Sequence, residues 1–429
     1  MIESLFNKEA YKIEFENLKA KAASRPGLLD RHYVNQGVTL RWVLYNQDLV
    51  IKEIIGQLKD KTYKTPIAVE RKVLIEEKER LLYYFDWHER ALQGVVSRVL
   101  NEALETKFSD SLNSYRKGRG AFNTLGQISQ YLSSLDYSSD VFVIKKDIKS
   151  YGDNIIHEKL FEILPSKVDM DDYFFEVVKK MIQFEYKRYP DGELVTKSIG
   201  LPTGSPINNV IANVFLMDLD EKIEQFKDRS CYFRYGDDIC VATPSKAVVE
   251  EVSGILDSFV SNAGLTFNNK GGLFTFDKTK NQQESFKYLG LMLKPNGLMS
   301  LTPQKEDEIK KEMDRLIIKI KTMTSGLTKN KTQKVDTIIR SSRSLFTKTK
   351  LYNFLCMYLP VVNDEEYWEK IDHWIAKRIL YLVYDNNNDS VFSKYPFSEM
   401  RKKGLISFRH MRRIILSGDR VKLNKYLES

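Results

Sequence analysis

Residues 231–242 read CYFRYGDDICVA, so two short apolar runs surround a Gly-Asp-Asp turn. Apolar runs on both sides of a tight turn are typical of a β-hairpin. The tip of such a hairpin presents two adjacent carboxylates, Asp237 and Asp238, which repel each other unless a cation neutralises them. Asp171 and Asp172 form a second acidic pair, but their polar surroundings favour a solvated surface. The context of the first pair therefore predicts a cation site.

A third carboxylate lies at the end of an expected buried strand. Residues 141–147 read VFVIKKD, an apolar run of strand length that ends at Asp147. Phosphoryl transfer assisted by two Mg²⁺ ions requires hard oxygen ligands from separate elements, with the ions about 3.5–4 Å apart. On its own, Asp147 would more often be a helix or loop cap. Beside the hairpin, it predicts a catalytic site in which Asp147 and Asp237 are the principal Mg²⁺ ligands and Asp238 a secondary one, with Mn²⁺ as a possible substitute.

The rest of the chain reads as an α+β protein. Residues 67–75 alternate apolar and charged side chains, as a half-buried strand does, and residues 80–85 are expected to pair with them. Asp86 and Glu89 favour a capping box for a helix that runs to about residue 108. Further expectations are N-terminal helices with Trp42, Val43, Tyr45 and Leu49 in the core, helices over 204–224 and 246–262, a hairpin within 286–301 that turns at 295–297, and a helix beyond Pro303.

Composition narrows the class of protein. With 429 residues, 42% of them hydrophobic, the chain can form two or three folded domains. No apolar run is long enough for a membrane span, and no export signal stands out. The three cysteines lack the spacing of a zinc site and favour a reduced, cytoplasmic setting. The net charge is +9, and residues 394–429 alone hold ten Lys or Arg against three Asp or Glu. This basic tail is either a solvated helical face or a phosphate-binding surface.

Several motifs between residues 69 and 301 resemble, in order, those of prokaryotic reverse transcriptases of the group II intron, retron and abortive-infection types. The segments that carry the resemblance are KER at 78–80 and NSYRKGRGA at 113–121 in the fingers, Asp147 in motif A, GLPTGSP at 200–206 with Ala212 and Asn213 in motif B, YGDD at 235–238 in motif C, GLTFNNK at 264–270 in motif D, and FKYLG at 286–290 in the primer grip. Together, these ordered matches are far more specific than any one of them.

The resemblance implies roles for further residues, and Ile148 is expected to join the three carboxylates at the metal site. The nucleotide-binding residues are expected to be Lys78, Arg80, Tyr151, Gly152, Thr203, Gly204 and Lys270. The nucleic-acid contacts are expected to be Arg116, Lys117, Arg119, Tyr288, Leu289, Gly290, Arg401, Lys402, Lys403, Arg412 and Arg413. The basic residues are expected to bind phosphate groups through charge-assisted hydrogen bonds. The alternative is that they are ordinary solvated charges on a strand and a loop.

Two positions depart from the family pattern. Thr203 stands where motif B usually has Gln, and Gly152 stands where most reverse transcriptases have an aromatic residue that excludes the ribose 2′-hydroxyl. Glycine would leave that space empty, unless Gly152 serves backbone geometry at a strand end. Ser205 is expected to cap the helix that follows motif B.

The fold implied by the resemblance is a right-hand polymerase: an N-terminal helical extension (1–65), fingers (66–137), a palm with an antiparallel sheet (138–301), a helical thumb (302–393) and a basic C-terminal region (394–429). The implied function is RNA-directed DNA synthesis in bacterial antiphage defence, with an RNA template or structured non-coding RNA, nucleoside triphosphates and a DNA product as partners. The alternatives are an RNA-synthesising or template-independent polymerase, a group II intron or retron enzyme, and a scaffold with vestigial carboxylates. No membrane partner is expected, and a homo-oligomer stays open.

Overall fold

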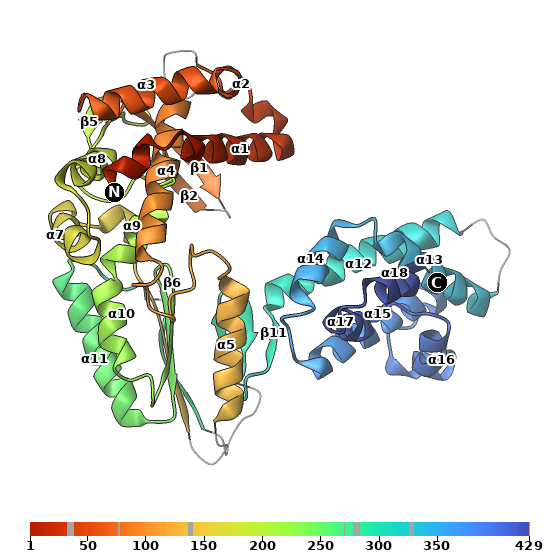
Figure 1. Ribbon diagram of the computed structural model, residues 1–429. Helices are drawn as coiled ribbons and strands as arrows, with labels where there is room; N and C mark the ends of the chain where they lie inside the picture. Colours follow the sequence, from red (N-terminus) through yellow and green to blue (C-terminus); the bar gives the residue numbers. More distant parts are fainter. Residues whose placement is uncertain are drawn as a thin grey trace. The chain divides into compact units, whose positions relative to one another are not determined.

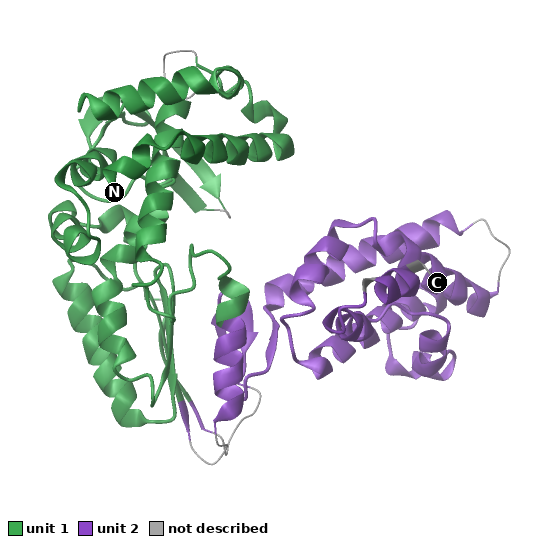
Figure 2. Cartoon of the chain, in the orientation of Figure 1, with its two compact units in different colours: residues 1–124, 142–275 green, residues 125–141, 276–429 purple. Residues whose placement is uncertain are grey.

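The computed structural model describes residues 1–31, 38–75, 78–135, 140–269, 271–277, 284–325 and 330–428. Figure 1 labels the helices and strands. These residues form two compact units, coloured separately in Figure 2: residues 1–124 with 142–275, and residues 125–141 with 276–429. The five regions expected from the sequence stay a prediction. Within the described residues, no helix combines the length and the apolar character needed to cross a bilayer.

The first unit begins with helices, as expected. Short turns at Ile2–Phe6 (η1) and Pro26–Leu28 (η2) accompany α1 (Lys8–Ser24), α2 (Leu40–Tyr45) and α3 (Gln47–Lys59), which pack against α4 (Trp87–Leu104). The expected core of this region is largely wrong. Val43 is buried, but Trp42, Tyr45 and Leu49 are 41%, 89% and 47% exposed. The apolar stripe of α3 supplies the core instead, because its members recur at helical spacing: Val50, Ile51, Ile54, Ile55 and Leu58.

Helix α4 has half of the expected capping box. The Asp86 carboxylate accepts the backbone N–H of Glu89 at 2.8 Å, which caps the helix. The Glu89 side chain does not reach back to the cap. It is buried and accepts hydrogen bonds from the Tyr63 hydroxyl and the Gln93 amide.

A four-stranded sheet follows, in the order β2-β1-β4-β5. Its strands are β1 (Ala68–Ile75), β2 (Lys78–Tyr84), β4 (Glu185–Lys187) and β5 (Leu194–Thr196). Strands β1 and β2 pair antiparallel, as the alternating sequence predicts, whereas β4 lies parallel to β1. A small aromatic core of Tyr83, Phe85 and Phe184 fixes one face of this sheet.

A second sheet has the order β6-β7-β3-β8 and is called the carboxylate sheet below. Its strands are β3 (Val141–Asp147), β6 (Cys231–Tyr235), β7 (Asp238–Thr243) and β8 (Gly272–Phe276). The accompanying helices are α6 (Tyr151–Asn154), α7 (His157–Lys167), α8 (Asp172–Ile182), α9 (Asn208–Phe215), α10 (Met217–Glu224) and α11 (Lys246–Asn262). Helix α11 has the predicted bounds, but the helix expected over 204–224 begins later and breaks at Leu216.

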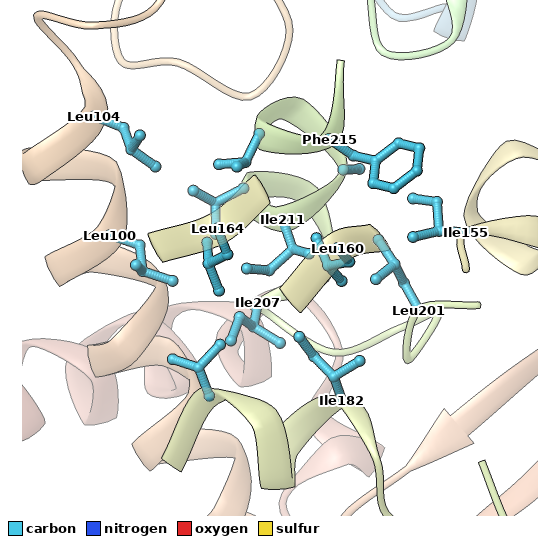
Figure 3. Close-up of a cluster of buried hydrophobic side chains, with 14 of the residues drawn as sticks. Leu100, Leu104, Ile155, Leu160, Leu164, Ile182, Leu201, Ile207, Ile211 and Phe215 are labelled. Carbon is cyan, nitrogen blue, oxygen red and sulfur yellow. The ribbon is translucent and has the colours of Figure 1, made fainter. Parts of the chain in front are cut away.

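The helices of this unit share one hydrophobic core. Figure 3 shows Leu100 and Leu104 of α4 near the side chains of Leu164 on α7 and Ile211 on α9. All four are fully buried. This packing holds α9 in place, and α9 carries Asn213, which contacts Ser114 and Arg234 beside the turn described below.

The second unit combines a small sheet with a helical bundle. Its strands are β9 (Phe286–Tyr288), β10 (Leu291–Leu293) and β11 (Met299–Leu301), in the order β11-β10-β9. Its helices are α5 (Ala121–Ser134, from Leu125 onward), α12 (Pro303–Met323), α13 (Lys331–Phe346), α14 (Lys350–Tyr358), α15 (Glu365–Tyr384), η3 (Asp389–Ser393), α16 (Phe397–Lys402), α17 (Phe408–Leu416) and α18 (Arg420–Glu428). The predicted turn before β11 is confirmed: Gly297 has φ +80°, and a Cβ there would lie 2.3 Å from the Ser129 carbonyl oxygen.

Candidate active site

Strand pairing brings the three predicted carboxylates to one end of the carboxylate sheet. Asp147 at the end of β3 lies opposite Asp238 at the start of β7. Gly236 and Asp237 form the two-residue turn between β6 and β7, and Gly236 has φ +67°, which a two-residue hairpin turn requires at its first position. The backbone N–H of Ile148 donates to the Asp237 carbonyl at 3.3 Å. The turn is therefore tied directly to the end of β3.

Burial and neighbouring carboxylates favour the protonated forms of Asp237 and Asp238. Burial, followed by Asp147, raises the pKa of Asp237 to about 6, and the two carboxyl groups lie within hydrogen-bonding range. Burial also raises the pKa of Asp238, although Lys145, whose Nζ lies 3.7 Å from Asp238 Oδ1, opposes this shift. The Asn268 backbone N–H donates to the Asp147 carbonyl at 2.7 Å, and its side-chain amide donates to the Asp147 carboxylate. A divalent cation would stabilise the ionised pair.

The donor set fits Mg²⁺ on two carboxylates. No group of three or more His, Cys, Asp or Glu side chains in the described ranges has the arrangement of a metal site. Asp147 and Asp237 face each other, whereas Asp238 is paired with Lys145. Mg²⁺ is commonly held by one or two carboxylates, with water and phosphate oxygens as its other ligands. The Ile148 side chain is apolar and fully buried, so only its backbone could contribute.

A buried arginine that the sequence did not single out supports the turn. Arg234 has no exposed surface, and its guanidinium donates to both oxygens of Asp220 at 2.7 and 2.5 Å. It also donates to the Gly236 carbonyl at 3.1 Å. The Gly236 N–H donates to the Ser114 hydroxyl at 2.8 Å, and the Asn213 amide donates to the Ser114 carbonyl. A charged residue in an apolar strand implies a buried partner, but the sequence does not identify which one.

The segment GLPTGSP lies against α6 and β2. The Leu201 N–H donates to the Gly152 carbonyl at 2.7 Å, and the Tyr83 N–H donates to the Thr203 carbonyl at 2.9 Å. Gly204 has φ +98°, and its carbonyl accepts from Arg90. The segment therefore links strand β2 to helix α6.

The proposed cap at Ser205 is wrong. Its hydroxyl donates to the buried Gln93 side chain at 2.7 Å, and α9 begins at Asn208 without a side-chain cap.

The family is decided by comparison with known proteins. The family model described as "Reverse transcriptase (RNA-dependent DNA polymerase)" matches residues 70–293, just over half of the chain and including all three carboxylates. The chain belongs to the reverse transcriptase family. This membership, together with the antiparallel carboxylate sheet and its helices, confirms the predicted α+β class and right-hand polymerase fold.

Curated relatives of this reverse transcriptase include two intron-encoded proteins. The "Uncharacterized 91 kDa protein in cob intron" of Schizosaccharomyces pombe is 28% identical over 232 residues, which are 53% of this chain and 26% of the relative. The "Group II intron-encoded protein LtrA" of Lactococcus lactis subsp. cremoris is 28% identical over 233 residues, 52% of this chain and 35% of the relative. The chain therefore spans about a quarter to a third of the length of these relatives.

Solved structures with a similar arrangement include two telomerases. Telomerase from Candida albicans, solved with a TWJ fragment of telomeric RNA, is 11% identical, with a TM-score of 0.49 and 86% of this chain and 65% of that chain covered. Apo telomerase from Candida tropicalis is 13% identical, with a TM-score of 0.46 and 84% and 62% covered.

The expected nucleotide-binding residues of the reverse transcriptase fall into two groups. Lys78 and Arg80 are exposed on β2 and, being two residues apart, project from one face. Tyr151 does not join them, because its ring is 5% exposed and its hydroxyl donates to the Ala212 carbonyl. Gly152 lies in α6 rather than at a strand end, with no positive φ, and a Cβ there would meet nothing within 4 Å. Lys270 lies outside the described residues.

The expected template-contacting residues differ in whether their side chains are available to a nucleic acid. Arg116 is 6% exposed, and its guanidinium donates to the Glu105 carboxylate and to the carbonyls of Ser109 and Leu112. It anchors its own loop and does not present a charge to a template. Arg119 pairs with an exposed aspartate, Asp110, and Lys117 is exposed.

In the second unit, the primer-grip segment is held internally. Tyr288 is fully buried, Leu289 and Gly290 have positive φ, and the Gly290 carbonyl accepts from Lys305 at 2.9 Å. A buried Tyr288 side chain is not available to a primer.

Part of the basic tail is neutralised. Arg409 and Arg413 both donate to Glu365, which lowers the pKa of that carboxyl to about 2, with Arg413 as the larger cause. Arg412 donates to the Val362 carbonyl at 2.9 Å. Arg401, Lys402 and Lys403 are exposed, although Lys402 pairs with Glu399 at 2.6 Å.

Proposed function

We propose that this reverse transcriptase is an RNA-directed DNA polymerase that adds nucleotides by two-metal nucleotidyl transfer. The observation that carries the proposal is the convergence of Asp147, Asp237 and Asp238 at one end of the carboxylate sheet, where the pKa of Asp237 is raised to about 6. Carboxylates gathered in this way are stabilised in their ionised form by a divalent cation.

The residues around this pair have complementary roles. Bound Mg²⁺ would supply Lewis-acid stabilisation of charge on the phosphate oxygens. Asn268 orients the Asp147 carboxylate by donating to it. Lys78 and Arg80 on β2 hold the triphosphate through charge-assisted hydrogen bonds. Thr203 and Gly204 border the nucleotide through their backbone, because Gly204 has no side chain to obstruct close approach.

The proposal is tested by removing one metal-binding charge. Asp237→Asn keeps the size of the side chain but removes its charge, so extension of a DNA primer on an RNA template should fall below detection. Mg²⁺ should raise the melting temperature of the wild type, and the same variant should lose this rise. Asp172→Asn, in the other acidic pair, is the matched control and should change neither readout. Wild-type extension rates in Asp237→Asn would exclude this site.

One observation favours a second candidate, synthesis with ribonucleotides. Because Gly152 has ordinary helical backbone angles and open space around a Cβ, its backbone does not require glycine. The position therefore accepts a Cβ atom, and it lacks the aromatic ring that most reverse transcriptases have there. Gly152→Phe should restore rejection of ribonucleotides, measured as the ratio of kcat/KM for each ribonucleotide to that of its deoxy counterpart. If the wild type already rejects ribonucleotides, this candidate fails.

The biological role we propose rests on the resemblance to abortive-infection enzymes: defence against phage, with a structured non-coding RNA as partner. The exposed residues Arg401, Lys402 and Lys403 are the part of the basic tail best suited to phosphate contacts. Plaque counts on cells that carry the wild type or Asp237→Asn test the role. Equal plaque counts would exclude it, and sequencing of copurifying nucleic acid identifies the template.

A further inference from the structure

The loop before α5 is fixed to strand β6 and to the Gly236-Asp237 turn by two backbone hydrogen bonds and one side-chain hydrogen bond. The Arg234 N–H donates to the Ser111 carbonyl at 3.0 Å, and the Asn113 N–H donates to the Arg234 carbonyl at 3.3 Å. The Ser114 hydroxyl accepts from Gly236 at 2.8 Å. These contacts lie within the first unit, so this loop and the turn form one rigid structure.

Tyr115 is presented from this loop in a strained conformation. It is 52% exposed, although its neighbours Ser114 and Arg116 are 0% and 6% exposed. Its φ is +59°, in the left-handed region that bulky residues rarely adopt. Such strain persists only where the surroundings enforce it, and here the anchored residues on both sides do so. Strained residues of this kind cluster at functional sites.

The ring of Tyr115 lies over the Tyr-Gly-Asp-Asp turn. Its centroid is 6.3 Å from that of Tyr235, and a Cβ at Gly236 would lie 3.9 Å from Tyr115 Cε2. Burial raises the pKa of the Tyr115 hydroxyl, Tyr235 and Asp237 add to the shift, and Arg80 opposes it. The ring is therefore within electrostatic reach of both a carboxylate and an expected triphosphate-binding cation.

We propose that Tyr115 is a substrate-contacting residue that packs its ring against the base and sugar of the incoming nucleoside triphosphate. This inference rests on the proposed function, which places the phosphates of that nucleotide between Asp237 and Arg80. An aromatic ring presented beside that line offers a stacking surface that accepts any base. The nucleotide thus gains a contact that depends on the ring and not on the hydroxyl.

The test distinguishes the contribution of the Tyr115 ring from that of its strained backbone conformation. Tyr115→Asn removes the ring but suits the left-handed conformation, and Tyr115→Gly does so without any strain. Tyr115→Phe keeps the ring and removes only the hydroxyl. Tyr45→Asn replaces an exposed tyrosine on α2 and is the control. The readouts are KM and kcat in primer extension, the Kd for template and primer, and equilibrium binding of a fluorescent deoxynucleoside triphosphate with Ca²⁺ in place of Mg²⁺.

Removal of the ring should raise the nucleotide KM and Kd by roughly 5- to 140-fold, the range that corresponds to removing one stacked base from an aromatic ring. The kcat should change much less, the Kd for template and primer should stay at the wild-type value, and Tyr115→Phe should behave as the wild type. Nucleotide binding by Tyr115→Asn and Tyr115→Gly equal to that of the wild type would overturn the inference. A different outcome separates the two proposals. If the wild type binds the nucleotide but extends no primer, and Tyr115→Asn and Tyr115→Gly lose nucleotide binding, the polymerase proposal fails and the assignment of Tyr115 stands.

Discussion

Replacement of Arg234 by Met should destabilise the first unit and slow nucleotide addition. Arg234 and Asp220 are 0% and 3% exposed at their side chains, and two guanidinium nitrogens donate to the Asp220 carboxylate. Without Arg234, the Asp220 carboxylate keeps the Tyr232 hydroxyl as a donor but has no cation beside it among these contacts. The carbonyl of Gly236, next to Asp237, also loses its donor.

The size of the effect follows from these contacts. Removing one member of a buried ion pair costs about 3–5 kcal/mol, because the other charge stays buried. An unsatisfied buried carbonyl adds about 1–3 kcal/mol. The expected decrease in stability, about 4–8 kcal/mol, is comparable to the whole stability of many domains. A displacement of about 1 Å at the turn could also lower the rate of nucleotide addition about 100-fold.

Two further variants make the assay specific. Arg234→Met combined with Asp220→Asn leaves no buried charge, so most of the stability should return. In the single variant, the isolated Asp220 should have a raised pKa. The folded protein then binds a proton that the unfolded chain releases, so the single variant should lose stability as pH rises and approach the double variant in acid. Arg119→Met is the control, because its partner Asp110 is 92% exposed and such pairs contribute about 0–1 kcal/mol.

Urea denaturation, monitored by circular dichroism at several pH values, measures these differences. The reasoning is refuted if Arg234→Met is no less stable than Arg119→Met, or if adding Asp220→Asn makes the single variant still less stable. A folded Arg234→Met protein with wild-type extension rates would refute the role of Arg234 at the turn.

Two other predictions concern charge. Burial, followed by Asp86, raises the pKa of Glu89 from 4.5 to about 8, so the folded protein keeps this proton while the unfolded chain loses it. The stability of the wild type should therefore fall as pH rises between these two pKa values. Glu89→Gln should flatten the curve of denaturation midpoint against pH. Parallel curves for the two proteins would contradict this prediction. For the basic tail, replacing Arg401 and Lys403 with Ala should reduce the log–log salt slope of RNA binding by roughly 0.7 to 0.9 for each phosphate that is no longer neutralised. Arg413→Ala should leave that slope unchanged, since Arg413 is paired with Glu365; an equal reduction by both changes would show that the pairing does not matter.

Local chemistry explains which parts of the fold were predictable. The hairpin around Gly236, the strand that ends at Asp147 and the helix α11 each depend on hydrophobic periodicity and on one turn or cap residue. These signals lie within about ten neighbouring residues, so the sequence carries them without knowledge of the rest of the chain.

Contacts between distant segments were not predictable in the same way. The sequence places Arg234 in an apolar strand but does not pair it with Asp220, and nothing local joins Ser114 to Gly236. The number of charges in the tail can be counted from the sequence, yet the count does not reveal that Arg409 and Arg413 share Glu365. Each of these contacts depends on tertiary packing.

Gly200 and Gly152 show why such packing decides function as well as fold. Both belong to motifs that resemble the family, and either could have been explained by backbone geometry. Gly200 has φ +76°, and a Cβ there would lie 2.5 Å from the Asp153 carbonyl oxygen, so its backbone requires glycine. Gly152 has neither constraint. Because backbone geometry does not account for Gly152, Gly152→Phe can test the proposed role in sugar selection without forcing a strained backbone.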